Sequence, residues 1–232
     1  MTRAIFVHSF FPREKFYDPA NPELINFKDY TPWLLKQLTM RDIFANAPLM
    51  PWPYAPDFAK WKYEFERYEP DENTILIGQS LGSGFLARWL SEQPTAKIGH
   101  VFLVAPAIYN RENPDPDPLK MKFGEFKLDP DLARKTKSLT IFESTDDMPA
   151  IQNTYSFLRE NLRGVKFIEL PARGHFTTIT AGEINREFPE LLAEILATNS
   201  NETSQSCHPE TRGKSLIFPD IQDPENSRKG QK

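Results

Sequence analysis

Short runs of apolar residues recur along the chain, and each has the length and composition of a β-strand. They lie at Ala4–Val7, Ile75–Ile77, His100–Val104, Leu139–Phe142 and Lys166–Leu170. Their apolar positions are continuous rather than alternating, which is typical of strands buried on both faces. The pattern therefore predicts a central sheet that is shielded from solvent on both sides.

Segments with the 3.6-residue period of a helix lie between these runs. They cover residues 56 to 67, 83 to 92, 150 to 162 and 182 to 197. Alternating strands and helices form a parallel sheet with right-handed crossovers. We therefore expect an α/β fold with a mostly parallel central sheet and helices on both faces. In such sheets ligands bind beyond the carboxyl ends of the strands.

Two long segments rich in proline, residues 11 to 55 and 106 to 136, interrupt the alternation. Each follows a predicted strand, so each is expected at the edge of the sheet where a ligand would bind. The second segment contains the run Asn113–Pro118, in which every second residue is proline. Two interpretations remain open for it: a lid over the site, or a solvated loop stiffened by proline.

The length of 232 residues fits one domain followed by a tail. We assign residues 1–197 to the domain. Residues 198–232 are rich in Ser, Asn, Glu, Pro and Lys and are expected to be a disordered tail. The single cysteine, Cys207, lies in this tail and can form neither an internal disulfide nor a cysteine zinc site.

The net charge of −4 and the absence of any block of Lys and Arg argue against nucleic acid or an anionic membrane as a partner. The chain begins without a hydrophobic signal segment and has no run near the about eighteen apolar residues of a membrane span. We therefore expect a soluble, cytoplasmic protein, and the sequence identifies no protein partner. No nucleotide-binding glycine motif and no metal-binding motif occurs, so no cofactor and no metal are expected.

The most specific motif is Gly-Gln-Ser-Leu-Gly at residues 78 to 82. It lies between the apolar run ending at Ile77 and the helical segment from residue 83, so Ser80 occupies a strand-to-helix corner. A nucleophilic serine on such a sharp turn needs residues without side chains two positions before and after it, and Gly78 and Gly82 meet that need. The motif predicts that Ser80 is a nucleophile.

A nucleophilic serine needs an imidazole to accept its proton. The candidates are His8, His100, His175 and His208. His208 lies in the tail, His100 opens a buried strand, and His8 ends the first strand. His175 follows the last strand-like run in a loop with Gly174, which fits the chain order serine, acid, histidine of α/β hydrolases. We therefore predict that His175 is the base.

The acid that orients the imidazole is expected after the preceding strand, where Asp146 and Asp147 are adjacent. One of two neighbouring loop carboxylates often turns the chain or caps the next helix. We favour Asp147 as the acid, although spacing alone does not separate the two residues.

Three blocks, Gly78–Gly82, Ser144–Asp147 and Gly174–Phe176, resemble the motifs of the small single-domain serine hydrolases of the retinoblastoma-binding-protein-nine type, also called YdeN-like. A helical stretch at Trp33–Leu38 resembles the same family. The resemblance covers about residues 3 to 197 and leaves the tail outside. It implies an α/β-hydrolase fold without a cofactor, activity on ester or related acyl bonds, and peptidase-like activity in some members. It also implies that Asp147 is the acid of the triad.

The loop after the first strand departs from the family pattern, because Ser9 and Phe10 stand where glycine is usual. This loop normally supplies one backbone N–H of the oxyanion hole, and the residue after the nucleophile supplies the other. By position, Leu81 and Phe10 are the expected donors. The ring of Phe10 is expected to narrow the space above Ser80.

Two functions from different classes follow from these residues. The first is a serine hydrolase that cleaves a small carboxylic ester or related acyl bond through an acyl-enzyme, with peptidase, thioesterase and acyltransferase activity left open. The second is a binding or scaffold module that keeps the fold without turnover. Ser80, Asp147 and His175 together favour the enzyme, because a binding module needs no such set.

Overall fold

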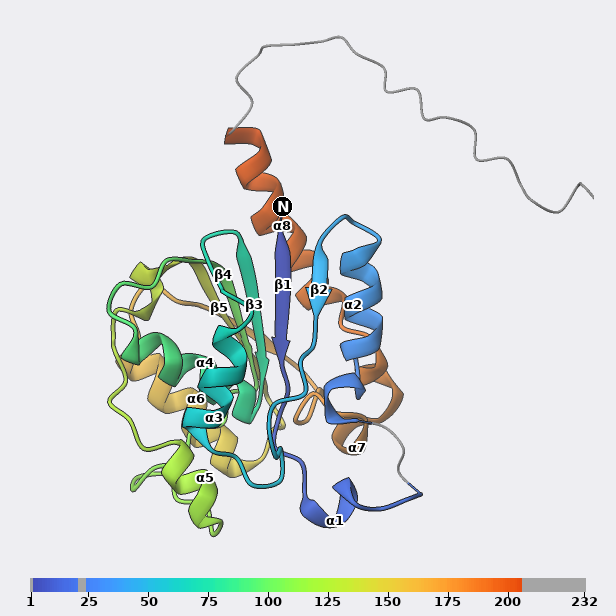
Figure 1. Cartoon of the computed structure of the whole chain (residues 1–232), viewed down its shortest axis with the longest axis vertical. Helices are drawn as coiled ribbons and strands as arrows, with labels where there is room; N and C mark the ends of the chain where they lie inside the picture. Colours follow the sequence, from blue (N-terminus) through green and yellow to red (C-terminus); the bar gives the residue numbers. More distant parts are fainter. Residues whose placement is uncertain (1, 21–23, 206–232) are drawn as a thin grey trace, which may run out of the picture.

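The computed structural model describes residues 2–20 and 24–205. Six parallel strands form one sheet in the order β2-β1-β3-β4-β5-β6 (Figure 1). The strands are β1 (Arg3–Val7), β2 (Phe44–Asn46), β3 (Thr74–Gln79), β4 (Ile98–Val104), β5 (Thr136–Ser144) and β6 (Lys166–Leu170). All of β3 and β4 is buried, as their continuous apolar runs predict. The predicted α/β fold with a parallel central sheet is confirmed.

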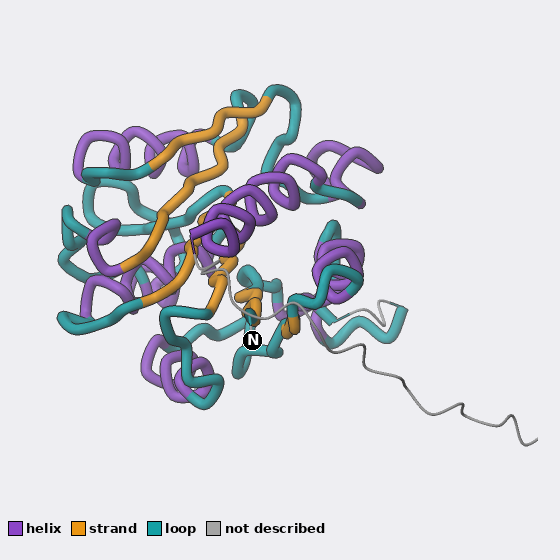
Figure 2. The backbone as a smooth tube through the Cα atoms, turned by 90° about the horizontal axis from the view of Figure 1, so that it is seen from above, coloured by secondary structure: helices purple, strands orange, loops and turns teal. Residues whose placement is uncertain are grey.

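Helices cover both faces of this sheet (Figure 2). They are α1 (Arg13–Phe16), α2 (Thr31–Thr39), α3 (Phe58–Glu66), α4 (Leu81–Glu92), α5 (Pro118–Phe123), α6 (Pro149–Asn161), α7 (Thr178–Ala181) and α8 (Pro189–Gln205), with short 3-10 turns at Ile25–Phe27, Leu132–Lys135 and Gly182–Arg186. The right-handed crossovers place α3, α4 and α6 on one face and α2 and α8 on the other. The carboxyl ends of the strands point toward the edge where α1, α5 and α7 lie (Figure 1).

Aromatic side chains fill the core on each face of the sheet. On one face the rings of Trp61 and Phe65 of α3 lie 5.9 and 5.3 Å from that of Phe85 of α4, edge to face. On the other face the Phe188 ring lies 5.1 Å from each of the rings of Tyr30, Phe142 and Phe176. Such pairs add to the stabilisation from buried area. On the first face they join α3 to α4, and on the second they connect β5 to the residues that precede α2 and α8.

The two irregular segments contain more regular structure than their composition indicates. The first includes α2, which agrees with the helical stretch expected at Trp33–Leu38, and the edge strand β2. Three residues with an exposed Phe44 are too short to give a strand pattern. The second segment includes α5 and a 3-10 turn.

The last predicted helix has different boundaries in the structure. A 3-10 turn covers Gly182–Arg186, and α8 begins only at Pro189. A residue before proline avoids the helical conformation, whereas proline is favoured at the first helical position, so the helix starts at Pro189. The helix continues to Gln205, so the expected boundary between domain and tail at 197/198 falls inside it. The rest of the predicted tail, with Cys207 and His208, lies outside the described residues.

Within the described part of the chain, no helix has both the length and the apolar character that crossing a bilayer requires.

His8 is a buried histidine that joins the end of β1 to the segment after β2. Its Nε2 accepts a hydrogen bond of 2.8 Å from the Met50 amide, so the ring proton is on Nδ1, which donates to the Ser9 carbonyl at 2.6 Å. The ring also packs edge to face on Trp61 at 5.4 Å. Burial lowers the pKa of His8 from 6.5 to about 4, against the smaller opposing effect of the Ser9 hydrogen bond.

This buried neutral imidazole predicts a loss of stability in acid. In the unfolded chain His8 is protonated below pH 6.5, whereas in the folded protein it is protonated only below about pH 4. The free energy of unfolding therefore falls as the pH is lowered from 6.5 to about 4. The contribution is about 3 kcal/mol of unfolding free energy. We expect His8→Gln to show a shallower pH dependence than the parent in urea unfolding between pH 4 and 6.5. Equal slopes for the two proteins would contradict this account.

Candidate active site

Ser80 occupies the corner between β3, which ends at Gln79, and α4, which begins at Leu81. Its backbone has φ 53° and ψ −117°, a conformation that side-chain-bearing residues rarely adopt. The Ser80 amide donates to the Val104 carbonyl of β4 at 2.9 Å, which holds the strained residue against the neighbouring strand. The corner predicted from the motif is therefore present.

The two motif glycines allow the backbone to close around this corner. A Cβ on Gly82 would lie 2.1 Å from the carbonyl oxygen of Val7 in β1, and a Cβ on Gly78 would lie 2.7 Å from the Ser83 Cα. Both contacts are with backbone atoms that cannot move aside. The structure therefore leaves no room for a side chain at residue 78 or 82, as the glycine spacing around Ser80 predicts.

The structure brings Ser80, His175 and Asp147 into one hydrogen-bonded chain. Ser80 Oγ donates to His175 Nε2 at 2.8 Å, and His175 Nδ1 donates to Asp147 Oδ1 and Oδ2 at 3.0 and 3.1 Å. The carboxylate can only accept, so it fixes the tautomer that leaves Nε2 free to receive a proton. The Asp147 side chain has 0% exposure, whereas 11% of the His175 side chain is exposed.

Asp146 points away from this chain and organises the two loops beside it. Its Oδ1 accepts hydrogen bonds from Ser144 Oγ at 2.6 Å and from the Gly174 amide at 2.9 Å. These two bonds, with that from Ser144 the larger effect, lower the pKa of Asp146. Asp146 therefore connects the loop after β5 to the loop that carries His175.

Two further residues that sequence reasoning did not identify hold the loop of His175. Arg173 is buried, and its Nη2 donates to both carboxylate oxygens of Glu190 in α8, with both N···O distances at 2.6 Å. Gln79, directly before Ser80, donates to the Phe176 carbonyl at 3.3 Å. Arginine is mostly exposed in proteins, so an arginine in a glycine-containing loop is expected at the surface. Nothing in the local sequence pattern indicates that Arg173 is buried.

The two expected oxyanion donors lie on adjacent parts of the fold. Leu81 is the first residue of α4, where a helix leaves its amide groups without intrahelical partners. Phe10 lies in the loop after β1, and the end of β1 abuts the first turn of α4, because a Cβ on Gly82 would also lie 2.5 Å from the His8 carbonyl oxygen. Phe10 lines the same cleft as His175.

This cleft, of about 690 Å³, opens at the carboxyl edge of the sheet. Its apolar walls include Phe10, Phe11, Pro12, Ile25, Met148 and Ile179, and its charged residues are Lys15, Asp18, Lys28, Asp29 and Arg186. The lining thus combines apolar walls with charged and polar side chains, so the cleft can contact both the apolar and the polar parts of a small molecule.

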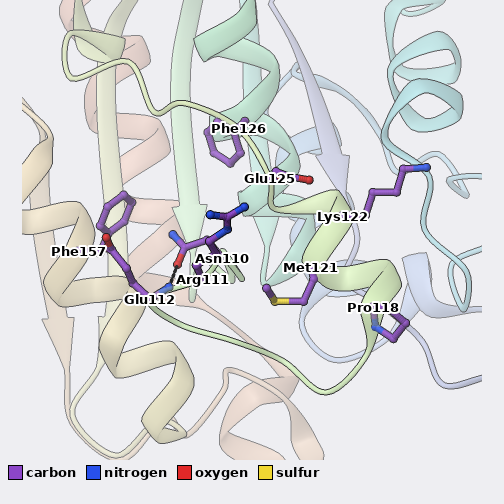
Figure 3. A pocket seen from close by; sticks show the side chains of 9 residues that line it. All are labelled: Asn110, Arg111, Glu112, Pro118, Met121, Lys122, Glu125, Phe126 and Phe157. Atoms are coloured by element: carbon purple, nitrogen blue, oxygen red, sulfur yellow. Dashed lines mark hydrogen bonds between the residues drawn. The ribbon is translucent and has the colours of Figure 1, made fainter.

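The segment of residues 106 to 136 contacts one wall of the cleft. Lys120 of α5 lies with its Nζ 4.5 Å from the centre of the Phe10 ring, and it pairs with Asp115 at 3.3 Å. A second cavity of about 560 Å³ lies between α5 and α6 (Figure 3). Its walls are Asn110, Arg111, Glu112, Pro118, Met121, Lys122, Glu125, Phe126 and Phe157, so it is separate from Ser80 and His175.

No group of three or more His, Cys, Asp or Glu residues is arranged to hold a metal ion in residues 2–20 and 24–205.

Comparison with solved structures places this architecture among α/β hydrolases. The ydeN gene product of Bacillus subtilis superposes with a TM-score of 0.63 at 19% identity, over 86% of this chain and 100% of the other. Est1E from Butyrivibrio proteoclasticus gives a TM-score of 0.56 at 13% identity, over 88% of each chain. A pyrethroid hydrolase from Sphingobium faniae JZ-2 gives 0.52 at 14% identity, over 88% of this chain and 99% of the other.

In sequence, no curated protein matches this chain. A family model described as serine hydrolase matches residues 28–188, which is more than half of the chain and includes the Ser80 motif and the loops of Asp147 and His175. The chain therefore belongs to the serine hydrolase family, with the α/β-hydrolase fold.

Proposed function

We propose that the protein cleaves a small carboxylic ester, or a related acyl bond, with Ser80 as nucleophile, His175 as base and Asp147 as the orienting acid. The observation that carries this proposal is the unbroken hydrogen-bonded chain from Ser80 Oγ through the imidazole to the buried Asp147 carboxylate. Each of the three groups contacts the next in the geometry that general-base activation of a hydroxyl requires.

The reaction begins when Ser80 Oγ attacks the acyl carbonyl and its proton moves to His175 Nε2. Asp147 stabilises the resulting imidazolium. The backbone N–H groups of Leu81 and Phe10 donate to the oxyanion of the tetrahedral intermediate. Collapse of the intermediate transfers the proton from His175 to the leaving alcohol and leaves an acyl-enzyme, which water then hydrolyses with His175 as the base again.

The choice of an ester rests on the cleft and on the similar structures. The apolar walls beside His175 suit the carbon skeleton of a small acyl substrate. One similar structure is described as a pyrethroid hydrolase, and Est1E is described with bound ferulic acid. Every step above uses side chains and amides of this chain together with water.

Ser80→Ala is expected to abolish turnover, because the nucleophile is lost while the fold is kept. Loss of the serine of a triad lowers kcat on the order of a millionfold. The test compares the parent and the variant in hydrolysis of p-nitrophenyl acetate and in labelling by a fluorophosphonate probe, which reacts only with an activated serine. Equal hydrolysis by both proteins would refute the assignment. A folded parent that is never labelled would favour the binding module.

The two adjacent aspartates are expected to respond differently to the same substitution. Asp147→Asn removes the acceptor that fixes the His175 tautomer and is expected to lower kcat by about 10⁴-fold. Asp146→Asn keeps an oxygen that can accept from the Gly174 amide, and we expect activity within about tenfold of the parent. Steady-state kinetics of the two variants measure this difference. The reverse ranking would transfer the role of the acid to Asp146.

A further inference from the structure

We propose that Tyr155 is a positioning residue of this site: its buried hydroxyl holds the Asp147 carboxylate in the orientation that His175 needs. This inference rests on the proposed function. It extends the chain of three groups to four, Tyr155–Asp147–His175–Ser80, with Tyr155 acting only through Asp147.

The contact is short and completely internal. Tyr155 Oη donates to Asp147 Oδ2 at 2.6 Å. Only 4% of Tyr155 is exposed, and the carboxylate that it contacts has no exposed surface. A hydroxyl bonded to an ionised oxygen forms one of the stronger hydrogen bonds in proteins, and burial increases its electrostatic strength.

Helix α6 gives this contact its rigidity. Asp147 lies just before the helix, next to its N-cap Met148, and Tyr155 lies on the second turn. Side chains on a helix lean toward its N-terminus, so the ring of Tyr155 extends back along α6 to the carboxylate. One continuous element therefore sets the separation between donor and acceptor.

The donors around Asp147 are divided between its two oxygens. His175 Nδ1 contacts both, the Met148 amide donates to Oδ1 at 2.7 Å, and Tyr155 donates to Oδ2. Each oxygen thus has a second donor besides the imidazole. Without Tyr155, Oδ2 would keep the imidazole alone, and the carboxylate would lose one of the two contacts that stop it from rotating.

The tyrosine remains a donor at every working pH. Burial and the adjacent Asp147 charge raise the pKa of Tyr155 well above its ordinary value, so the phenol stays protonated. Glu143 of β5 acts on Tyr155 in the same direction. Tyr109, whose pKa is raised to about 12 mainly by burial and then by Asp115 and Asp147, also stays neutral.

Removal of the hydroxyl has two consequences that loss of packing would not have. The carboxylate keeps more of its negative charge and stabilises the imidazolium more strongly, so the acid limb of the pH–rate profile moves to higher pH. The carboxylate is also less firmly oriented, which lowers the rate on the plateau above this limb. A merely structural tyrosine would change stability and leave the pH profile in place.

The experiment measures the second-order rate of fluorophosphonate labelling and kcat/KM for p-nitrophenyl acetate as functions of pH. For Tyr155→Phe we expect the labelling rate and kcat/KM to be about tenfold lower than in the parent. We also expect the acid limb of both pH profiles to lie about 0.5 pH unit higher. Replacement of Tyr155 by 3-fluorotyrosine keeps the fold and makes the phenol a stronger donor. It is expected to displace the acid limb downward, which supplies a test even if the phenylalanine variant folds poorly.

Tyr30→Phe is the matched control. Tyr30 is also buried, but among the described residues its hydroxyl has no hydrogen-bond partner, and its ring packs on Phe6 and Phe188. Removal of this hydroxyl is expected to leave the rate and the pH profile unchanged.

A double-mutant cycle with Asp147→Asn tests whether Tyr155 acts through Asp147. We expect Tyr155→Phe to cost less than about twofold in the Asp147→Asn background, in contrast to its effect in the parent. An unchanged pH profile in Tyr155→Phe, or an equal loss in both backgrounds, would overturn the inference while leaving the proposed function intact. A parent that is neither labelled nor active would overturn both.

Discussion

The close approach of β1 to the first turn of α4 is the constraint on which the site depends. Gly82 allows it, because any side chain there would overlap the Val7 carbonyl. The same approach puts the loop of Phe10 beside the N-terminus of α4 and holds Ser80 at its strained corner between β3 and α4. Ser80, the proposed nucleophile, and the expected oxyanion donors thus owe their relative positions to backbone packing rather than to side-chain contacts.

The loops that face Ser80 depend on polar groups instead. Asp146 joins the loop after β5 to that after β6, and the ion pair between Arg173 and Glu190 connects the second loop to α8. Asp147 is then left to interact with His175. The two adjacent carboxylates therefore differ in their hydrogen-bond partners. Asp146 bonds to groups of the two loops, and Asp147 bonds to the imidazole of His175.

Much of the fold was predictable from sequence because the central strands are buried on both faces and so carry continuous apolar runs. The Ser80 corner was predictable because its glycines are a steric necessity. The edge strand β2 was not, since three half-exposed residues leave no periodic pattern. The roles of Arg173 and Tyr155 were not predictable either. Arg173 meets its partner Glu190 only through tertiary packing. Tyr155 lies on the helix that directly follows Asp147, but neither arginine nor tyrosine signals burial in advance.

The hydrogen bond between Ser80 and His175 joins residues 95 positions apart in the chain. A contact of this separation closes a long loop, and the packing of the intervening β4, β5 and β6 compensates for the entropy lost in that closure. During translation the ribosome adds Ser80 to the chain 95 residues before it adds His175. Labelling of the proposed nucleophile Ser80 would therefore report that the strands from β3 to β6 have assembled.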